Sequence, residues 1–272
     1  MSRQHDTFQI NIKPFDIKKI KKESIVVLIG KRMTGKSFLV RDILYHNRDI
    51  PLGMIVSRTD HIVHYYDKFV PSALIHPRYE PDLIDKLFKR QERALNEGWK
   101  DPYAFLLFDD CLSDASNWAK DERVKEIFFN GRHYKLLFLL TMQSPMGIPP
   151  GFRTNIDFTF ILKNNNESDR EKIYKNYAGM FPSREIFNHV LDACTEDNHC
   201  LVIDNTTTSN KIEDQVFIYK ASPHDNFRIC SDEAWRRSNE KYSSHIIPKD
   251  DNNNEKIIKS KKQNIIIRKK NF

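Results

Sequence analysis

The sequence predicts an α/β fold in three layers, with a mostly parallel β-sheet between two layers of helices. Short apolar runs recur without alternation of polar and apolar residues, which is typical of strands buried on both faces. Amphipathic helical patterns lie between these runs, as the crossover connections of a parallel sheet require. With 272 residues, the chain is long enough to form one domain of this kind.

Each expected element can be placed from local sequence signals. The expected strands cover residues 24–30, 53–58, 103–110, 136–143, 158–164, 200–204 and 216–221. The expected helices cover residues 36–46, 81–99, 121–134, 168–179 and 183–194. Ser168 and Ser183 are candidate N-caps, and Pro81 followed by Asp82 is a typical helix start. No internal repeat is visible.

Composition divides the chain into a short N-terminal segment (1–23), one domain (24–238) and a basic tail (239–272). From residue 249 onward, eight Lys or Arg residues stand against three acidic ones, so much of the net charge of +7 lies there. The Lys/Asn-rich composition of the tail indicates a poorly ordered segment, or alternatively an arm that binds nucleic acid through phosphates. No apolar run approaches the ~18 residues of a membrane-spanning helix, so we expect a soluble protein without a membrane span.

The most specific local signal is G-x-x-x-x-G-K-[ST], which follows the first predicted strand and opens the first predicted helix. It comprises Gly30, Lys31, Arg32, Met33, Thr34, Gly35, Lys36 and Ser37. Glycines let the backbone N–H groups approach phosphates closely, and a lysine supplies charge to the β- and γ-phosphates. The serine hydroxyl suits Mg²⁺. This motif predicts a site for ATP with Mg²⁺.

Two further strands are expected to end in polar residues at the same edge of the sheet. The run "YAFLLFDDC" places Asp109 at a carboxyl end, where open α/β sheets bind ligands, and we expect it to bind Mg²⁺. Asp110 is then a candidate to orient or deprotonate the attacking water. The run "FLLTMQSP" places Gln143 where an amide can contact the γ-phosphate and that water. A turn role for Asp110 is the alternative.

The order of these motifs resembles the FtsK–HerA superfamily of DNA-pumping ATPases, and within it the genome-packaging ATPases of large DNA viruses of the poxvirus type. The likeness covers roughly residues 24–235. Its specific parts are "FDD" at 108–110, "TMQ" at 141–143, and P-x-x-x-R-x-N, which ends in Arg153 and Asn155. The resemblance implies a P-loop sheet with an additional strand, in which the strand ending in Gln143 lies between the P-loop strand and the strand ending in Asp109.

The resemblance also implies a function and partners. It implies an ATP-hydrolysing motor that moves double-stranded DNA into a capsid as a ring-shaped homo-oligomer, in contact with a capsid or portal component. The location would be the virion or the cytoplasmic assembly site of the host, without secretion. An arginine of the neighbouring subunit would complete each nucleotide site, and Arg132 and Arg153 are the candidates, with Arg132 favoured. Lys120, Arg123 and Lys125 are candidate DNA contacts.

Two other functions compete with this interpretation. A P-loop kinase would transfer the γ-phosphoryl group to a small acceptor, but it usually needs an Arg-rich lid, and the region after Gln143 is Pro-rich instead. A nucleotide-binding scaffold would act through its basic tail, but the intact set of Lys36, Ser37 and Asp109 argues against a relic site. One departure weakens Asp110 as the base, because many members of the superfamily carry Glu at this position.

Overall fold

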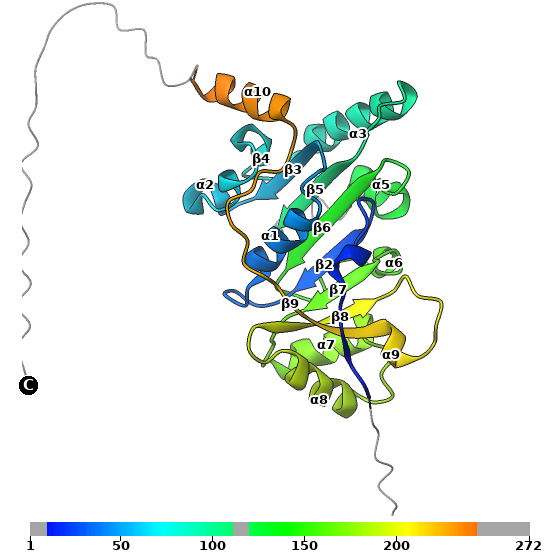
Figure 1. The fold of residues 1–272 in the computed structure, drawn as a ribbon. Helices are drawn as coiled ribbons and strands as arrows, with labels where there is room; N and C mark the ends of the chain where they lie inside the picture. The colour runs from blue at the N-terminus through cyan, green and yellow to red at the C-terminus, as the bar shows by residue number, and fades with distance from the viewer. Residues whose placement is uncertain (1–9, 111–119, 244–272) are drawn as a thin grey trace, which may run out of the picture.

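The structure is a computed structural model that describes residues 10–110 and 120–243 of the chain. Its centre is a mostly parallel sheet of nine strands in the order β1-β9-β8-β7-β2-β6-β5-β3-β4, with helices on both faces (Figure 1). The strands are β1 (Lys13–Pro14), β2 (Ile25–Ile29), β3 (Leu52–Ser57), β4 (Ile75–His76), β5 (Ala104–Asp109), β6 (Leu136–Met142), β7 (Phe158–Ile161), β8 (His199–Asp204) and β9 (Val216–Lys220). The predicted three-layer α/β class is confirmed.

The strand order places β6 between β2 and β5, which confirms the additional-strand arrangement. Strand β6 pairs in parallel with both neighbours, so that Ile29 lies beside Met142 and Asp109 beside Thr141. Strand β8 departs from the expected parallel pattern, because it runs antiparallel to both β7 and β9. Its run is buried from Cys200 to Asp204 like the parallel strands, so burial alone does not reveal its direction.

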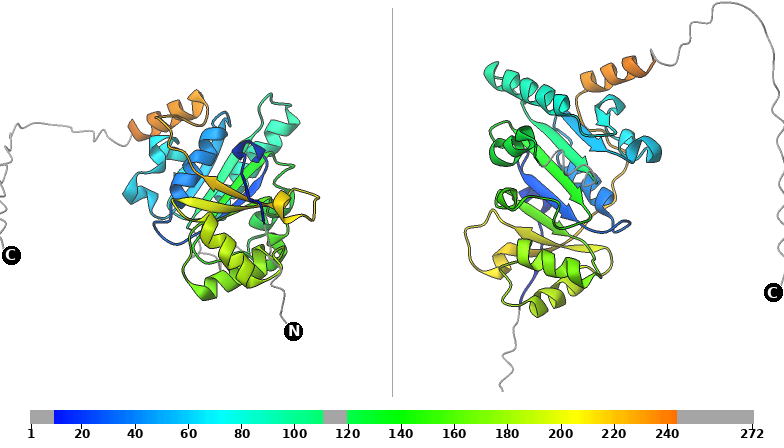
Figure 2. Two further views of the ribbon diagram at one scale, coloured as in Figure 1. Left: turned by 60° about the horizontal axis from the view of Figure 1, so that its bottom comes forward. Right: turned by 180° about the vertical axis from the view of Figure 1, so that it is seen from behind.

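Helices cover the sheet on both sides (Figure 2). The longer helices are α1 (Lys36–His46), α3 (Pro81–Asn96), α5 (Glu122–Asn130), α7 (Glu167–Tyr177), α8 (Arg184–Cys194) and α10 (Asp232–Ser243). Single-turn helices are α2 (Asp60–Val63), α6 (Pro150–Arg153) and α9 (Ile212–Gln215). Helix α1 packs on one face of the sheet, and α3, α5, α6, α7 and α8 contribute to the core on the other.

The P-loop strand β2 shows how the sheet separates these two cores. Val26 and Leu28 face α1, whereas Ile25, Val27 and Ile29 face the opposite core, because side chains alternate along a strand. All five side chains are almost completely buried. Burying an aliphatic side chain contributes on the order of 1.5–3 kcal/mol, so this strand fixes the base of the P-loop firmly.

Helix starts and segment ends differ in places from the sequence prediction. The predicted cap Ser183 is confirmed, since its side chain accepts a hydrogen bond from the Ile186 N–H. The predicted cap Ser168 is wrong, because Asn166 is the N-cap of this helix and its side chain accepts a hydrogen bond from the Asp169 N–H at 3.0 Å. Helix α10 runs across the predicted boundary at 238/239. Residues 244–272, most of the predicted tail, lie outside the described residues.

Short strands also extend the sheet at its outer edges. Strand β1, from the predicted N-terminal segment, pairs with β9, and β4 pairs with β3. Helix α10 lies near this second edge, where the Ser238 hydroxyl accepts a hydrogen bond from the Ala73 N–H at 3.0 Å. Within residues 10–110 and 120–243, no helix has the length and hydropathy needed to cross a bilayer.

Candidate nucleotide site at the carboxyl ends of the central strands

The P-loop leaves β2 at Gly30 and enters α1 at Lys36. Gly35 adopts a left-handed conformation with φ +96°, which only glycine accepts without strain, and it is the N-cap residue of α1. A Cβ on Gly30 would lie only 2.6 Å from Thr34 Oγ1 and 3.0 Å from Leu162 Cβ. Both glycines of the motif are therefore required by the shape of the loop.

Lys36 is folded into this loop. Its Nζ donates hydrogen bonds to the carbonyl oxygens of Gly30 at 2.7 Å and Lys31 at 2.8 Å. Burial lowers the pKa of the ammonium, whereas the nearby carboxylates of Asp110 and Asp109 act in the opposite direction. The loop thus holds a buried positive charge at the N-terminus of a helix, which is an environment that attracts phosphate.

Asp109 ends β5 as predicted and is held by both neighbouring strands. Its Oδ1 accepts a hydrogen bond from Thr141 Oγ1 at 2.7 Å, and its Oδ2 accepts one from Ser57 Oγ at 3.3 Å. These residues are its direct cross-strand neighbours on β6 and β3. Burial raises the pKa of the Asp109 carboxyl, although these hydroxyl donors oppose the shift. The carboxylate is thus buried and oriented by hydroxyl groups of both neighbouring strands.

Asp110 and Gln143 lie at the ends of the adjacent strands β5 and β6 and contact each other directly. The Gln143 side-chain amide donates a hydrogen bond to Asp110 Oδ2. Asp110 has a left-handed backbone with φ +52°, and its N–H donates to Thr141 Oγ1 at 3.0 Å. Such a conformation is uncommon for Asp and turns its side chain away from the direction that the strand would give it.

These side chains share one cavity of about 490 Å³ with the P-loop. Its lining includes Lys36, Ser37, Asp109, Asp110 and Gln143, together with Arg32, Met33, Thr59, Asp60, Val63, Tyr65 and Tyr66. The structure therefore brings together the predicted lysine, acidic pair and amide at one place.

The sequence interpretation missed a second wall of this cavity. Asp60 is buried and accepts hydrogen bonds from the N–H groups of Tyr65 at 3.0 Å and Tyr66 at 2.9 Å, which fixes the turn after β3. The Tyr66 hydroxyl is buried and has no hydrogen-bond partner among the described residues, although it faces Ser37 and Asp109. The only sequence signal was a polar turn directly after a buried strand.

Neither predicted arginine lines this cavity. Arg132 pairs with Asp157, which also accepts a hydrogen bond from the N–H of Ile25 at 2.8 Å, at the opposite end of β2 from the P-loop. Arg153 donates to the Ile148 carbonyl at 3.0 Å and to the Asn176 side chain. Both arginines are thus engaged in contacts away from the P-loop cavity.

Two of the predicted DNA contacts, Arg123 and Lys125, form ion pairs within the chain. Arg123 forms a two-pronged ion pair with Asp85 on α3, in which Nη2 donates to Oδ2 at 2.9 Å. These bonds raise the pKa of the guanidinium and tie α5 to α3. Lys125 pairs with Glu122 at 3.3 Å on the same helix. The positive charges of Arg123 and Lys125 on α5 are therefore already paired with carboxylates of the same chain.

The fold and this site define a P-loop NTPase of the additional-strand class. A solved structure of similar fold is the genome packaging NTPase B204 of Sulfolobus turreted icosahedral virus 2, in a complex with AMPPCP. The likeness has a TM-score of 0.54 with 17% sequence identity, and covers 75% of this chain and 100% of B204. The same protein in complex with ATP-gammaS gives a TM-score of 0.52.

Sequence relatives come from large DNA viruses. The uncharacterized protein L437 of Acanthamoeba polyphaga mimivirus is 41% identical over 215 residues, which cover 76% of each chain. The uncharacterized protein 075L of Invertebrate iridescent virus 6 is 40% identical, over 75% of this chain and 83% of the relative. No protein-family model matches the chain. The chain therefore belongs to a family of viral proteins that includes L437 of the mimivirus and 075L of the iridescent virus.

Proposed function

We propose that this protein hydrolyses ATP to move double-stranded DNA into a viral capsid, as a ring-shaped oligomer. The observation that carries the proposal is the convergence of Lys36, Asp109 and the Asp110–Gln143 pair on one cavity beside the P-loop. The likeness in fold to a packaging NTPase bound to AMPPCP supports the choice of substrate. The viral relatives support the biological setting.

In this proposal the P-loop holds the triphosphate. Backbone N–H groups at the start of α1 and the Lys36 ammonium face its oxygens, so Lys36 exchanges its bonds to the Gly30 and Lys31 carbonyls for bonds to phosphate. In this exchange the Lys36 ammonium leaves two neutral carbonyl oxygens and binds the negatively charged phosphate oxygens instead. Charge-assisted hydrogen bonds of this kind are about twice as strong as neutral ones.

Ser37 and Asp109 would hold Mg²⁺ with the nucleotide. The donor set fits, because hydroxyl and carboxylate oxygens are what Mg²⁺ prefers, and the buried, unpartnered Tyr66 hydroxyl faces both residues. When bound, the metal would neutralise charge on the β- and γ-phosphates. Thr141 and Ser57 keep the Asp109 carboxylate oriented toward this position.

The Asp110–Gln143 pair would position the attacking water. Asp110 is the candidate base, and the amide of Gln143 fixes its orientation across the two strand ends. A positioned carboxylate that accepts a proton typically contributes a factor of about 10²–10⁴ to the rate. Because Gln143 begins the loop after β6, loss of the γ-phosphate can be transmitted to that loop.

A second cavity beside the P-loop would receive the adenine base. It has a volume of about 370 Å³, and its lining joins Thr34 and Gly35 of the P-loop to the apolar side chains Phe38, Leu162 and Pro223. Apolar walls of this kind are typical of pockets for flat organic groups. The two cavities thus offer separate places for the phosphates and the base.

Assembly into a ring would complete the site. Met33, Ile62 and Val63 are strongly exposed apolar residues, and Met33 and Val63 line the phosphate cavity itself. Exposed apolar side chains around a site favour burial by a partner. The neighbour would supply an arginine to the developing charge on the γ-phosphate, and we propose Arg132 ahead of Arg153.

The decisive experiment compares the ATPase rate with and without long double-stranded DNA, alongside the particle mass in solution. We expect DNA to stimulate hydrolysis by a multimer, and the stimulation to weaken as salt increases, because phosphate contacts release counterions. Lys36→Ala protein serves as the control for contaminating ATPase. A monomer that ignores DNA but phosphorylates a small acceptor would instead establish the kinase interpretation.

A further inference from the structure

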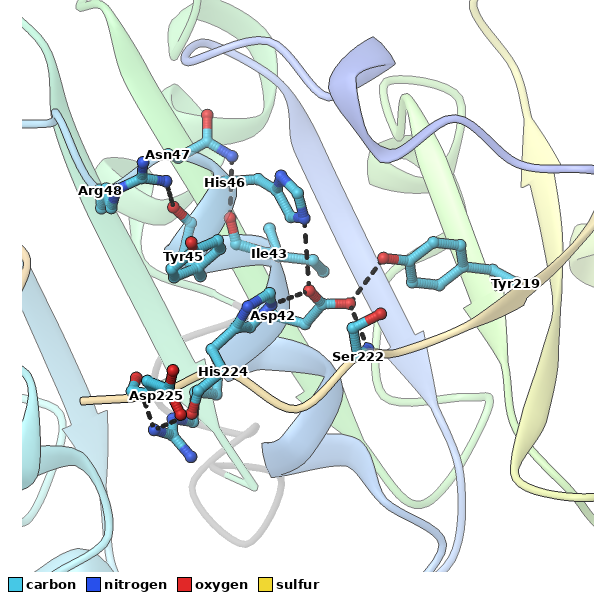
Figure 3. Close-up of polar contacts among 11 residues, drawn as sticks. Asp42, Ile43, Tyr45, His46, Asn47, Arg48, Tyr219, Ser222, His224 and Asp225 are labelled. Atoms are coloured by element: carbon cyan, nitrogen blue, oxygen red, sulfur yellow. Dashed lines mark hydrogen bonds and ion pairs between the residues drawn. The ribbon is translucent and has the colours of Figure 1, made fainter. Parts of the chain in front are cut away.

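A second cluster of polar side chains lies on helix α1, away from the P-loop cavity (Figure 3). Its centre is Asp42, whose carboxylate is completely buried. His46 follows one turn later on the same face of α1, and His224 approaches from the segment after β9. Within the described parts of the chain, no lysine or arginine forms an ion pair with Asp42.

The two oxygens of the Asp42 carboxylate have different partners. Oδ2 accepts hydrogen bonds from the Tyr219 hydroxyl at 2.6 Å and from the Ser222 N–H at 3.2 Å. Oδ1 faces both imidazoles, with His224 Nε2 at 2.5 Å and His46 Nε2 at 3.5 Å. Figure 3 shows both rings directed at this single oxygen. The hydrogen bonds to Oδ2 therefore fix the orientation of the carboxylate, and two imidazole nitrogens converge on Oδ1.

The position of His224 is fixed from two sides. Its ring stacks on Tyr45 with centroids 3.6 Å apart and planes 12° from parallel. Its backbone carbonyl accepts a hydrogen bond from Arg41 Nη2 at 3.0 Å. Both supporting residues belong to α1, so the helix holds the residue that approaches its own carboxylate. Ligands that are oriented before binding lose little conformational freedom when they bind.

We propose that Asp42, His46 and His224 bind one divalent transition-metal ion of the zinc type. Two imidazoles and a carboxylate form a donor set suited to Zn²⁺, and the three ligand atoms already lie within 4.8 Å of one another. Around a tetrahedral zinc with bonds of about 2.0–2.2 Å, ligand atoms are about 3.3 Å apart. His46 already stands at nearly that spacing from Oδ1, and His224 has to withdraw by roughly 1 Å.

The ion would take the place of the short His224–Asp42 hydrogen bond and balance the charge of a buried carboxylate. His46 is 27% exposed, which leaves a side open for a water as the fourth ligand. The consequence is a cross-link between α1 and the segment that follows β9. Because α1 begins with Lys36 of the P-loop, the ion would fix the helix that carries the phosphate-binding lysine.

The experiment titrates metal-free full-length protein with Zn²⁺ against a chromophoric chelator, without nucleotide or Mg²⁺. We expect one tight site per chain and a higher Tm with Zn²⁺. The His224→Ala variant should bind Zn²⁺ at least about tenfold more weakly, because removing even the outer partners of metal ligands lowers metal affinity by about 10–100-fold. The His46→Ala variant should lose affinity similarly while keeping the His224–Asp42 contact. His133→Ala, an exposed histidine elsewhere, is the matched control.

Titration with Co²⁺ identifies the ligands, because nitrogen and oxygen ligands lack the intense near-ultraviolet band of cobalt bound to cysteine thiolate. Wild-type protein that binds no Zn²⁺ would overturn the proposal and leave the cluster as a hydrogen-bonded clamp. Equal affinity in wild type and in both histidine variants would also overturn it, as would a thiolate band. Because nucleotide is absent, these outcomes are independent of the ATPase measurements.

Discussion

The side-chain amide of Gln143 at the end of β6 donates a hydrogen bond to the Asp110 carboxylate at the end of β5. The two residues are 33 positions apart in the chain, and adjacent strands bring them together. Asp110 adopts a left-handed backbone to reach this position. A local conformation that costs of the order of 1–3 kcal/mol is typical of functional sites, where the surrounding structure maintains it.

The first prediction separates the charge of Asp110 from its geometry. Asparagine can still accept the hydrogen bond from Gln143 through Oδ1, but it cannot take a proton from water. Asp110→Asn should therefore bind ATP with nearly unchanged affinity and hydrolyse it about 10²–10⁴-fold more slowly. Equilibrium binding of a fluorescent ATP analogue and a phosphate-release assay measure the two quantities.

The control for this variant is Asp49→Asn, which removes the same charge from an exposed aspartate paired with Lys22. It should leave both quantities unchanged, because exposed ion pairs contribute little. Loss of ATP binding in Asp110→Asn would instead reassign the residue to the metal site. A hydrolysis rate equal to that of wild type would leave Asp110 with a turn role only.

The second prediction concerns the lysine of the P-loop. Lys36→Ala removes the positive charge that faces the β- and γ-phosphates, and should lower ATP turnover by at least about 10²-fold, as for other groups that stabilise transition-state charge. Lys31→Ala is the matched control, since it removes the same charge from the same loop. If the two variants lose activity equally, the loop acts through its overall charge. Unchanged turnover in Lys36→Ala would remove the enzyme interpretation.

The third prediction follows from the buried carboxylate of Asp109. Burial raises its pKa in the folded protein above the value in the unfolded chain, so the folded state binds the proton more tightly. Asp109 therefore favours folding below its unfolded pKa, and this contribution is lost as pH rises through the folded pKa. At neutral pH the ionised side chain opposes folding in the absence of metal and nucleotide.

Asp109→Asn removes this charge and keeps an oxygen to accept from Thr141. We expect a higher Tm at pH 7 in protein free of nucleotide and Mg²⁺, together with loss of ATPase activity. The gain in Tm should shrink as the pH is lowered toward the unfolded pKa of an aspartate, about 3.9. Thermal unfolding followed by circular dichroism at several pH values measures it. A lower Tm across the whole range would show that the carboxylate stabilises the fold.

Much of this site could be predicted because its chemistry lies in contiguous motifs at strand ends. The run from residue 26 to 37 specifies a strand, a loop with two required glycines, and a helix, and the predicted bounds of α1 match the structure. Asp109 and Gln143 follow long apolar runs, so their place at one edge of a parallel sheet follows from topology.

The residues that were missed depend on contacts between strands. Thr141 and Ser57 flank Asp109 only because β6 and β3 are the neighbours of β5 in a particular register, and no local pattern specifies a register. Tyr66 enters the cavity because Asp60 fixes a turn through two backbone N–H groups. The antiparallel direction of β8 could not be predicted for a similar reason, because a fully buried strand has the same apolar pattern in a parallel and in an antiparallel sheet.

The fourth prediction tests the proposed role of Arg132 at the nucleotide site of a neighbouring subunit. The Arg132 side chain is 62% exposed and lies near the start of β2, where it pairs with Asp157. The P-loop follows the other end of this strand, and at 3.3 Å per residue the two ends of β2 are about 13 Å apart. In the proposed ring, Arg132 would therefore act at the nucleotide of a neighbouring subunit rather than at that of its own chain. Arg132→Ala should lower ATP turnover by about 10³–10⁵-fold, as for other arginines that act across an interface.

Mixing Arg132→Ala protein with Lys36→Ala protein should restore part of the activity. In a mixed ring, some interfaces join an intact P-loop from the first protein to an intact Arg132 from the second, and only those interfaces can turn over. The same mixture with Arg153→Ala tests the second candidate, whose guanidinium bonds to Asn176 and the Ile148 carbonyl instead. Absence of rescue, with mixed assembly confirmed by native mass spectrometry, would mean that Arg132 does not act across the interface. If activity returns only in the mixture of Arg153→Ala with Lys36→Ala protein, the role passes to Arg153. Complementation requires the missing side chain to come from the partner.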